Sequence, residues 1–287
     1  MRRVLLHADD VGMCHGANRA YLDLFRAGRL DSGSVMVPCP WFPEIAHAAT
    51  GDPSLDLGVH LTLTSEWFGY RWAPVSTRSA ASGLLDADGF LPRDVVSLRR
   101  ALVPEAAEAE MRAQVDRALA AGIDVTHLDT HMGAALVPEL LPATLRIARE
   151  ARLPLLLPRD IGSYLSVLRL GDVDAAIYDE AFATLQGWGM PVFDRFAMTP
   201  GVTPDIGAYA AVLVPEAPGL TFVSLHPNAP GDIEAITASH PRQDPAWRTG
   251  EAALLASGAA DALLAREGVE RIGFRVLRDA WRAAGIR

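Results

Sequence analysis

Short apolar runs alternate with longer amphipathic stretches along nearly the whole chain. The runs have the length and composition of buried parallel strands, and the stretches have the period of covering helices. The predicted strands are Arg3–Ala8, Gly33–Pro38, Leu55–Leu63, Val125–Thr130, Pro154–Leu157, Val192–Ala197, Leu220–Leu225 and Arg271–Phe274. Seven or eight parallel strands in this alternation predict an α/β fold, an irregular (β/α) barrel similar to a TIM barrel.

Two predicted helices carry clear boundary signals. Pro104–Ala121 opens with Pro and Glu and is followed by glycine, while the other begins at Asp244-Pro245 and runs to about Arg266. Proline in the first turn loses no needed donor, and glycine tolerates the left-handed exit. The pattern is unclear over 159–171. We find no internal repeat or linker, so a single catalytic domain over 1–287 is predicted.

The segment 65–93 is the longest stretch without periodicity, and it is rich in Trp, Tyr, Ser, Gly and Pro. A loop of this length inside a compact domain is uncommon and is often functional. We therefore predict a long loop insertion here.

Composition narrows the functional classes. Half of the 287 residues are hydrophobic, and the net charge of -9 comes from 26 basic and 35 acidic residues with no basic run, which argues against nucleic-acid binding. No window approaches the ~20 apolar residues of a membrane span, and the apolar N-terminal stretch is too short for the core of a signal peptide. Cys14 and Cys39 are expected to be buried apolar fillers in a reducing compartment. We expect a cytoplasmic protein, and the pattern leaves a homo-oligomer open.

Polar residues collect where predicted strands end. Asp9 and Asp10 end the first strand, and His60 lies late in the third. His131 follows the fourth strand, and His226 follows the seventh. In a barrel of parallel strands these ends meet on one rim, so the five side chains are expected to converge.

Asp9 and Asp10 are adjacent carboxylates, which repel each other and are costly to bury together unless a cation neutralises them. The alternative for this Asp-Asp-x-Gly stretch is ordinary turn chemistry. Because consecutive strand residues point to opposite faces, both carboxylates can reach one site only if the strand bulges at its end.

The histidines have both structural and functional interpretations. His127, Asp129 and His131 share one strand face by the two-residue period, which suits a metal site in which His127 and Asp129 orient the ligand through hydrogen bonds. His60 alone could equally be a hydrogen-bonded core residue. His226 is either bonded to a loop carbonyl or a proton donor to a leaving amine.

With these blocks the sequence resembles the YdjC-like carbohydrate deacetylases, the group that contains chitooligosaccharide deacetylase. The matching blocks, in order, are His7-Ala-Asp-Asp-Val-Gly12 with Asn18, Gly58-Val-His-Leu-Thr-Leu-Thr64, Thr126-His-Leu-Asp-Thr-His131 and Ser224-Leu-His-Pro227. The resemblance implies an irregular (β/α) barrel of the polysaccharide-deacetylase type.

The resemblance also implies roles for particular residues. One divalent metal would be held by Asp10, His60 and His131. Asp9 would be the general base, and His226 would act as general acid or polarise the substrate. Arg159 matches an arginine that steers the base or the substrate, although an ordinary surface ion pair is the alternative.

The sequence departs from this family pattern in two places. Relatives continue the fourth block with further histidines, whereas here Met132-Gly133-Ala134-Ala135 follows His131. The 65–93 insertion also looks unlike the chitooligosaccharide enzyme. Its aromatic side chains are predicted to be exposed at the rim and to stack on sugar rings, or else to pack the loop against the barrel; they are Trp67, Tyr70 and Trp72, together with Trp247 beyond the loop.

These inferences predict a metal-dependent hydrolase that removes the acetyl group from an N-acetylated sugar or oligosaccharide by attack of a metal-bound water. Mixed nitrogen and oxygen ligands favour zinc and also suit cobalt, nickel or manganese, while the resemblance keeps magnesium. One alternative is another metal-dependent amidohydrolase or a phosphoesterase, which would need anion-binding groups such as Arg159 and Arg71. The other alternative is a sugar-binding barrel without catalysis.

Overall fold

The computed structural model describes residues 1–168, 170–201, 204–238 and 244–285. All strand pairs in these residues are parallel and belong to one sheet of seven strands. The strands are β1 (Arg2–Val11), β2 (Ser32–Val35), β3 (Leu57–Leu61), β4 (Val125–Thr130), β5 (Arg195–Met198), β6 (Gly219–Leu225) and β7 (Val269–Arg271).

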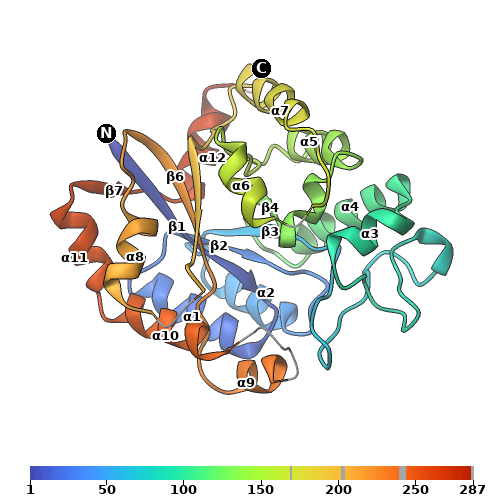
Figure 1. Ribbon diagram of the computed structural model, residues 1–287, viewed down its shortest axis with the longest axis horizontal. Coiled ribbons are helices and arrows are strands. Elements are labelled where there is room, and N and C mark those ends of the chain that lie inside the picture. The colour runs from blue at the N-terminus through green and yellow to red at the C-terminus, as the bar shows by residue number, and fades with distance from the viewer. Residues whose placement is uncertain (169, 202–203, 239–243, 286–287) are drawn as a thin grey trace.

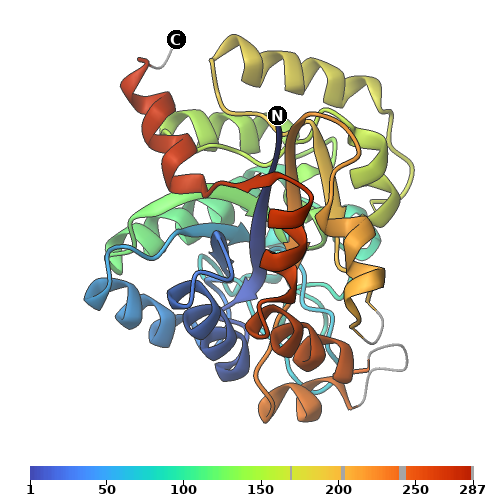
Figure 2. The same cartoon turned by 90° about the vertical axis from the view of Figure 1, so that its left-hand side faces the viewer.

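Helices surround the strands on the outside (Figures 1 and 2). The helices are α1 (His15–Arg26), α2 (Phe42–Gly51), α3 (Val95–Ala101), α4 (Pro104–Ala120), α5 (Leu141–Glu150), α6 (Ile161–Val167), α7 (Ala176–Gly187), α8 (Ile206–Leu213), α9 (Asp232–Thr237), α10 (Ala246–Ala256), α11 (Ala259–Arg266) and α12 (Phe274–Ala283), with the short 3-10 turns η1 (Ala80–Ser82) and η2 (His131–Leu136). Their apolar faces and the strands bury one continuous hydrophobic core.

The strands close into an irregular barrel. The sheet runs in the order β4-β3-β2-β1-β6-β5, and β7 pairs with the start of β1. Single parallel bridges, Leu128 to Leu155 and Pro158 to Phe193, join the two ends of this sheet through the segment 154–158. The predicted α/β barrel is therefore confirmed, with seven strands in the described residues.

Several helix and strand boundaries differ between the prediction and the structure, each for a local reason. The segment 154–158 contributes bridges but no regular strand, because a proline without an N–H donor lies at each end of it. The helix predicted from Asp244 is two helices, α10 and α11, separated by Gly258 in the left-handed region (φ 77°). The last predicted strand ends at Arg271, because α12 begins at Phe274.

The two unclear segments also take definite forms. The stretch 159–171 contains the short helix α6, whose first turn is capped by Asp160, which accepts a hydrogen bond from the Ser163 backbone N–H. The 65–93 insertion is a long loop, in which the described residues form only η1. Buried Glu110 of α4 accepts hydrogen bonds from the backbone of Val75 and Ser76, which anchors the loop to the barrel.

Within the described residues, none of the helices combines the length and apolar character that a membrane crossing needs. Cys14 and Cys39 are both buried and free, as the sequence predicted. Burial raises the pKa of the Cys14 thiol to about 12 and also raises that of Cys39.

Candidate active site

The first strand ends in the bulge that two adjacent carboxylates require. Between the pairs Ala8 with Gly33 and Val11 with Val35, β1 advances three residues while β2 advances two. Asp10 lies at this point with φ 61°, in the left-handed region that non-glycine residues seldom adopt. The distorted backbone turns both Asp9 and Asp10 toward one cavity, which both of them line.

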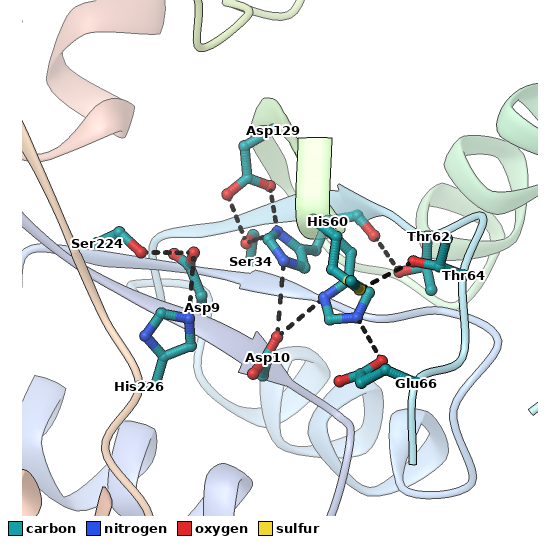
Figure 3. A network of polar contacts seen from close by, with 12 residues as sticks. Asp9, Asp10, Ser34, His60, Thr62, Thr64, Glu66, Asp129, Ser224 and His226 are labelled. Carbon is teal, nitrogen blue, oxygen red and sulfur yellow. Dashed lines mark hydrogen bonds and ion pairs between the residues drawn. The ribbon is translucent and has the colours of Figure 1, made fainter. Parts of the chain in front are cut away.

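Asp10, His60 and His131 form a candidate metal cluster at the ends of β1, β3 and β4. Figure 3 shows Asp10 and His60 of this cluster, with Asp129 behind His60. The Asp10 Oδ1 atom lies 3.7 Å from His60 Nε2 and 3.2 Å from His131 Nδ1. This buried oxygen has no hydrogen-bond partner. An unsatisfied carboxylate oxygen facing two imidazole nitrogens fits a cation, since burying such an oxygen without a partner is costly.

Each imidazole of the cluster is oriented by a carboxylate behind it. His60 Nδ1 lies 2.9 Å from Asp129 Oδ1, and Ser34 donates a hydrogen bond to the other oxygen of Asp129 at 2.9 Å. His131 Nε2 lies 2.9 Å from Glu66 Oε2, a residue of the long loop. These contacts leave His60 Nε2 and His131 Nδ1 directed at Asp10, as ligand histidines require.

The carboxylates also set the protonation of the cluster. Burial alone would lower the pKa of His131, but the charge of Glu66 and contact with Asp10 raise it to about 10. Burial likewise opposes protonation of His60, but Asp129 raises its pKa. A metal must therefore displace protons from this site when it binds.

Asp9 lies beside the cluster and is held from two sides. Its Oδ1 is 2.7 Å from His7 Nδ1, and its Oδ2 accepts a hydrogen bond of 2.7 Å from Ser224 on β6. His226, just beyond β6, places its Nε2 atom 3.8 Å from the same Oδ2. Burial lowers the pKa of His226, and its backbone N–H donates to Glu251 of α10, which fixes the residue.

His127 lies one layer deeper in the barrel and contacts His7. The two Nε2 atoms are 3.0 Å apart, and the His127 ring stacks on Phe274 with centroids 3.7 Å apart. Gly58 makes room for this ring, because a Cβ atom there would lie 2.4 Å from it. Two further groups could place ligand atoms close enough for a metal, His7-His127-Asp129 and Asp9-His60-Asp129, but in each of them two members already bond each other.

A cavity of about 350 Å³ opens over these residues and has two unlike halves. Its polar side chains come from the ends of β1, β3, β4 and β6, from the long loop and from α10. Its apolar side is formed by Leu156, Phe196 and Met198 and by Tyr164, Val167 and Leu168 in and after α6. The cavity thus offers a reactive centre on one side and a surface for apolar parts of a substrate on the other.

None of the aromatic side chains predicted at the rim lines the cavity, which favours the alternative interpretation in which they pack against the barrel. Trp67 and Trp72 are buried, and Trp72 donates its Nε1–H to the Thr64 carbonyl at 2.8 Å. Tyr70 is partly buried, and its hydroxyl donates to the Met13 carbonyl at 2.6 Å. The polar atoms of Trp72 and Tyr70 are satisfied by backbone acceptors, so these two rings pack the loop against the barrel.

Arg159 also lies outside the cavity, so its proposed role in steering the base or the substrate stays a prediction. Its side chain is 54% exposed, pairs with Asp194 at 3.5 Å and lies over the Phe182 ring, outside the cavity. It makes the surface ion pair that was the alternative interpretation. Arg71 is likewise engaged elsewhere, with Asp86 at 2.7 Å.

Arg248 of α10 is the main residue that sequence reasoning missed. It lines the cavity, is 5% exposed and donates from Nη1 to Asp10 Oδ2 at 3.1 Å. An arginine in an amphipathic helix gives no sign of this position. Ser224 could have been found, since it lies two residues before His226 in the same strand end.

Comparison with known proteins agrees with the geometry. A family model described as YdjC-like protein matches residues 3–266. A carbohydrate deacetylase of Thermus thermophilus is 35% identical over 256 residues, which are 88% of this chain and 84% of the relative. One of Brevibacillus brevis is 35% identical over 156 residues, which are 54% of this chain and 59% of the relative.

A solved structure supports the fold alone. It belongs to a protein of Enterococcus faecalis V583 whose description names cellobiose-phosphate cleavage as a provisional assignment. The TM-score is 0.74 at 20% identity, over 96% of this chain and 98% of the other. With the family model spanning nearly the whole chain, the protein belongs to the YdjC-like family.

Proposed function

We propose that this chain is a metal-dependent carbohydrate deacetylase, which hydrolyses the amide of an N-acetylated sugar. The observation that carries the proposal is the buried Asp10 Oδ1, which has no hydrogen-bond partner and faces His60 and His131, with Asp9 and His226 on the same cavity. Relatives named carbohydrate deacetylase support the substrate class.

The cation would be held by Asp10 Oδ1, His60 Nε2 and His131 Nδ1. Two imidazole nitrogens and one carboxylate oxygen suit zinc first, whereas magnesium prefers oxygen donors. When bound, the cation lowers the pKa of a water molecule and polarises the acetyl carbonyl.

Asp9 is the proposed general base. It faces the cavity, and its two oxygens are fixed by His7 and Ser224, so the carboxylate is oriented before the substrate arrives. It accepts one proton from the water whose oxygen bonds to the acetyl carbon.

His226 is the proposed proton donor to the leaving nitrogen. Burial lowers its pKa, so its ring is neutral before the reaction. His226 Nε2 lies 3.8 Å from Asp9 Oδ2, so the two must close to hydrogen-bond distance in the substrate complex. The proton that Asp9 takes from water then passes to His226, and from it to the amine as the C–N bond breaks.

The direct test measures acetate and free amine after incubation with N-acetylglucosamine and its oligomers. Zinc-loaded protein should release both in equal amounts, and a chelator should stop the release. The Asp9→Asn variant should lose activity by about 10²–10⁴-fold. The matched control Asp94→Asn alters an exposed helix cap of α3 and should keep activity. A lack of acetate release from every N-acetylated sugar would refute the proposal.

A phosphoesterase is the second candidate, because Arg248 places a cation in the cavity wall. Its Nη1 is already bonded to Asp10, however, and the rest of the described lining offers no second arginine or lysine. Release of phosphate from sugar phosphates, without release of acetate, would favour this reaction instead.

A further inference from the structure

Arg248 is a buried cation held directly against the carboxylate that we propose as a metal ligand. Its guanidinium carbon lies 4.6 Å from the centroid of the Trp247 ring and 5.8 Å from that of Trp67. Only 5% of the residue is exposed, and its Nε atom has no hydrogen-bond partner. The two indole faces stabilise the charge and fix its position.

The two oxygens of Asp10 are used differently. Oδ2 accepts the hydrogen bond from Arg248 at 3.1 Å, while Oδ1 has no hydrogen-bond partner and faces His60 and His131. A cation at this cluster therefore meets one carboxylate oxygen, and the guanidinium prevents the second from joining. The carboxylate also stays ionised, since contact with His131 and the charge of Arg248 outweigh the burial that would raise its pKa.

We propose that Arg248 is a positioning residue that limits Asp10 to one ligand oxygen and weakens cation binding, and that it thereby makes the loaded site less negative. The inference rests on the proposed metal-dependent function. Four carboxylates line the cavity, Asp9, Asp10, Glu66 and Asp129, and with Arg248 they sum to a charge of -3 when the histidines are neutral. A divalent cation brings this sum to -1, whereas without Arg248 the loaded site would carry -2.

The reduced negative charge is the functional gain. Negative charge develops on the carbonyl oxygen as water attacks an amide, and a fixed cation in a buried site stabilises it strongly. The cost of this arrangement is a lower affinity for the metal. Arg248 thus exchanges some metal affinity for stabilisation of the transition state.

The test is a calorimetric zinc titration of metal-free protein, without substrate. Arg248→Met keeps an apolar stem of similar length and removes the charge, so its zinc Kd should fall by about tenfold or more while acetate release also falls. Arg248→Lys restores a positive charge and should return the Kd toward the wild-type value. Arg159→Met, which removes an exposed arginine outside the cavity, is the control and should leave zinc affinity unchanged.

An unchanged or weaker zinc affinity in Arg248→Met would overturn the inference, because it would mean that the arginine only orders Asp10. If this variant does not fold by circular dichroism, Arg248→Gln replaces it with the same expectation. Wild-type protein that binds zinc but deacetylates no sugar refutes the proposed function, while the affinities still decide the role of Arg248. Wild-type protein that does not bind zinc refutes both.

Discussion

Replacing Asp129 with asparagine changes one atom of the group that orients His60. Asp129 accepts hydrogen bonds through both oxygens, from His60 Nδ1 and from Ser34 Oγ, each at 2.9 Å. An asparagine offers one acceptor oxygen, so one contact is lost and the negative charge behind the imidazole disappears. Removing such a partner typically lowers metal affinity about 10- to 100-fold, which corresponds to about 1.4–2.7 kcal/mol.

Calorimetric titration of metal-free Asp129→Asn with zinc measures this loss directly. Asp56→Asn is the matched control, because Asp56 is 3% exposed against 2% for Asp129 and accepts hydrogen bonds from Ser32 and Thr126. It precedes β3 and so lies at the other end of that strand from His60. We expect Asp56→Asn to lower the melting temperature but not the zinc affinity. Equal zinc affinity in Asp129→Asn and wild type, with both folded, would refute the orienting role.

Three other variants test separate parts of the structure. Gly58→Ala drives a methyl group into the His127 ring, where a Cβ would lie at 2.4 Å, and should lower the free energy of unfolding by about 1–3 kcal/mol in urea denaturation. Burial raises the pKa of Asp31 to about 6, so the stability that its protonated form contributes is complete below about pH 4 and is lost as pH rises through 6. Asp31→Asn should therefore remove up to about 3 kcal/mol of this pH-dependent fall in the free energy of unfolding. A pH profile of stability that is the same in the variant and wild type would contradict the argument. Glu66→Gln removes the charge that raises the pKa of His131, so zinc binding at pH 7 should release fewer protons, which calorimetry in two buffers of different ionisation enthalpy will detect.

The positions of the site residues followed from periodicity because strand ends in a parallel barrel share one rim. Asp10, His60 and His131 are separated by up to 121 residues, yet each lies at or just after the end of a strand. The bulge at Asp9 could also be predicted, since two adjacent side chains cannot otherwise reach one face. Asp129 was expected beside His131 on one strand face, whereas the structure pairs it with His60 of the neighbouring strand.

Other features depended on contacts that one sequence does not reveal. Arg248 is buried because two indole faces and a distant carboxylate meet it, and no local pattern encodes that meeting. The rings of Trp67 and Trp72 could not be placed from composition, because a loop that packs and a loop that projects use the same residues. Glu66 reaches His131 only through the course of that loop.

The backbone hydrogen bonding between neighbouring strands of the barrel wall is uneven. The proposed metal ligands lie on the continuously paired strands, while part of the apolar cavity wall does not. The strands that carry the proposed ligands pair continuously from β1 to β4, whereas isolated bridges alone join the described parts of 154–158 to their neighbours. Leu156 lies in that loosely bonded stretch, and Phe196 and Met198 lie on β5, which borders it. Exchange of Leu156 therefore disturbs few ladder bonds, so this part of the apolar cavity wall can be reshaped while the proposed metal cluster keeps its geometry.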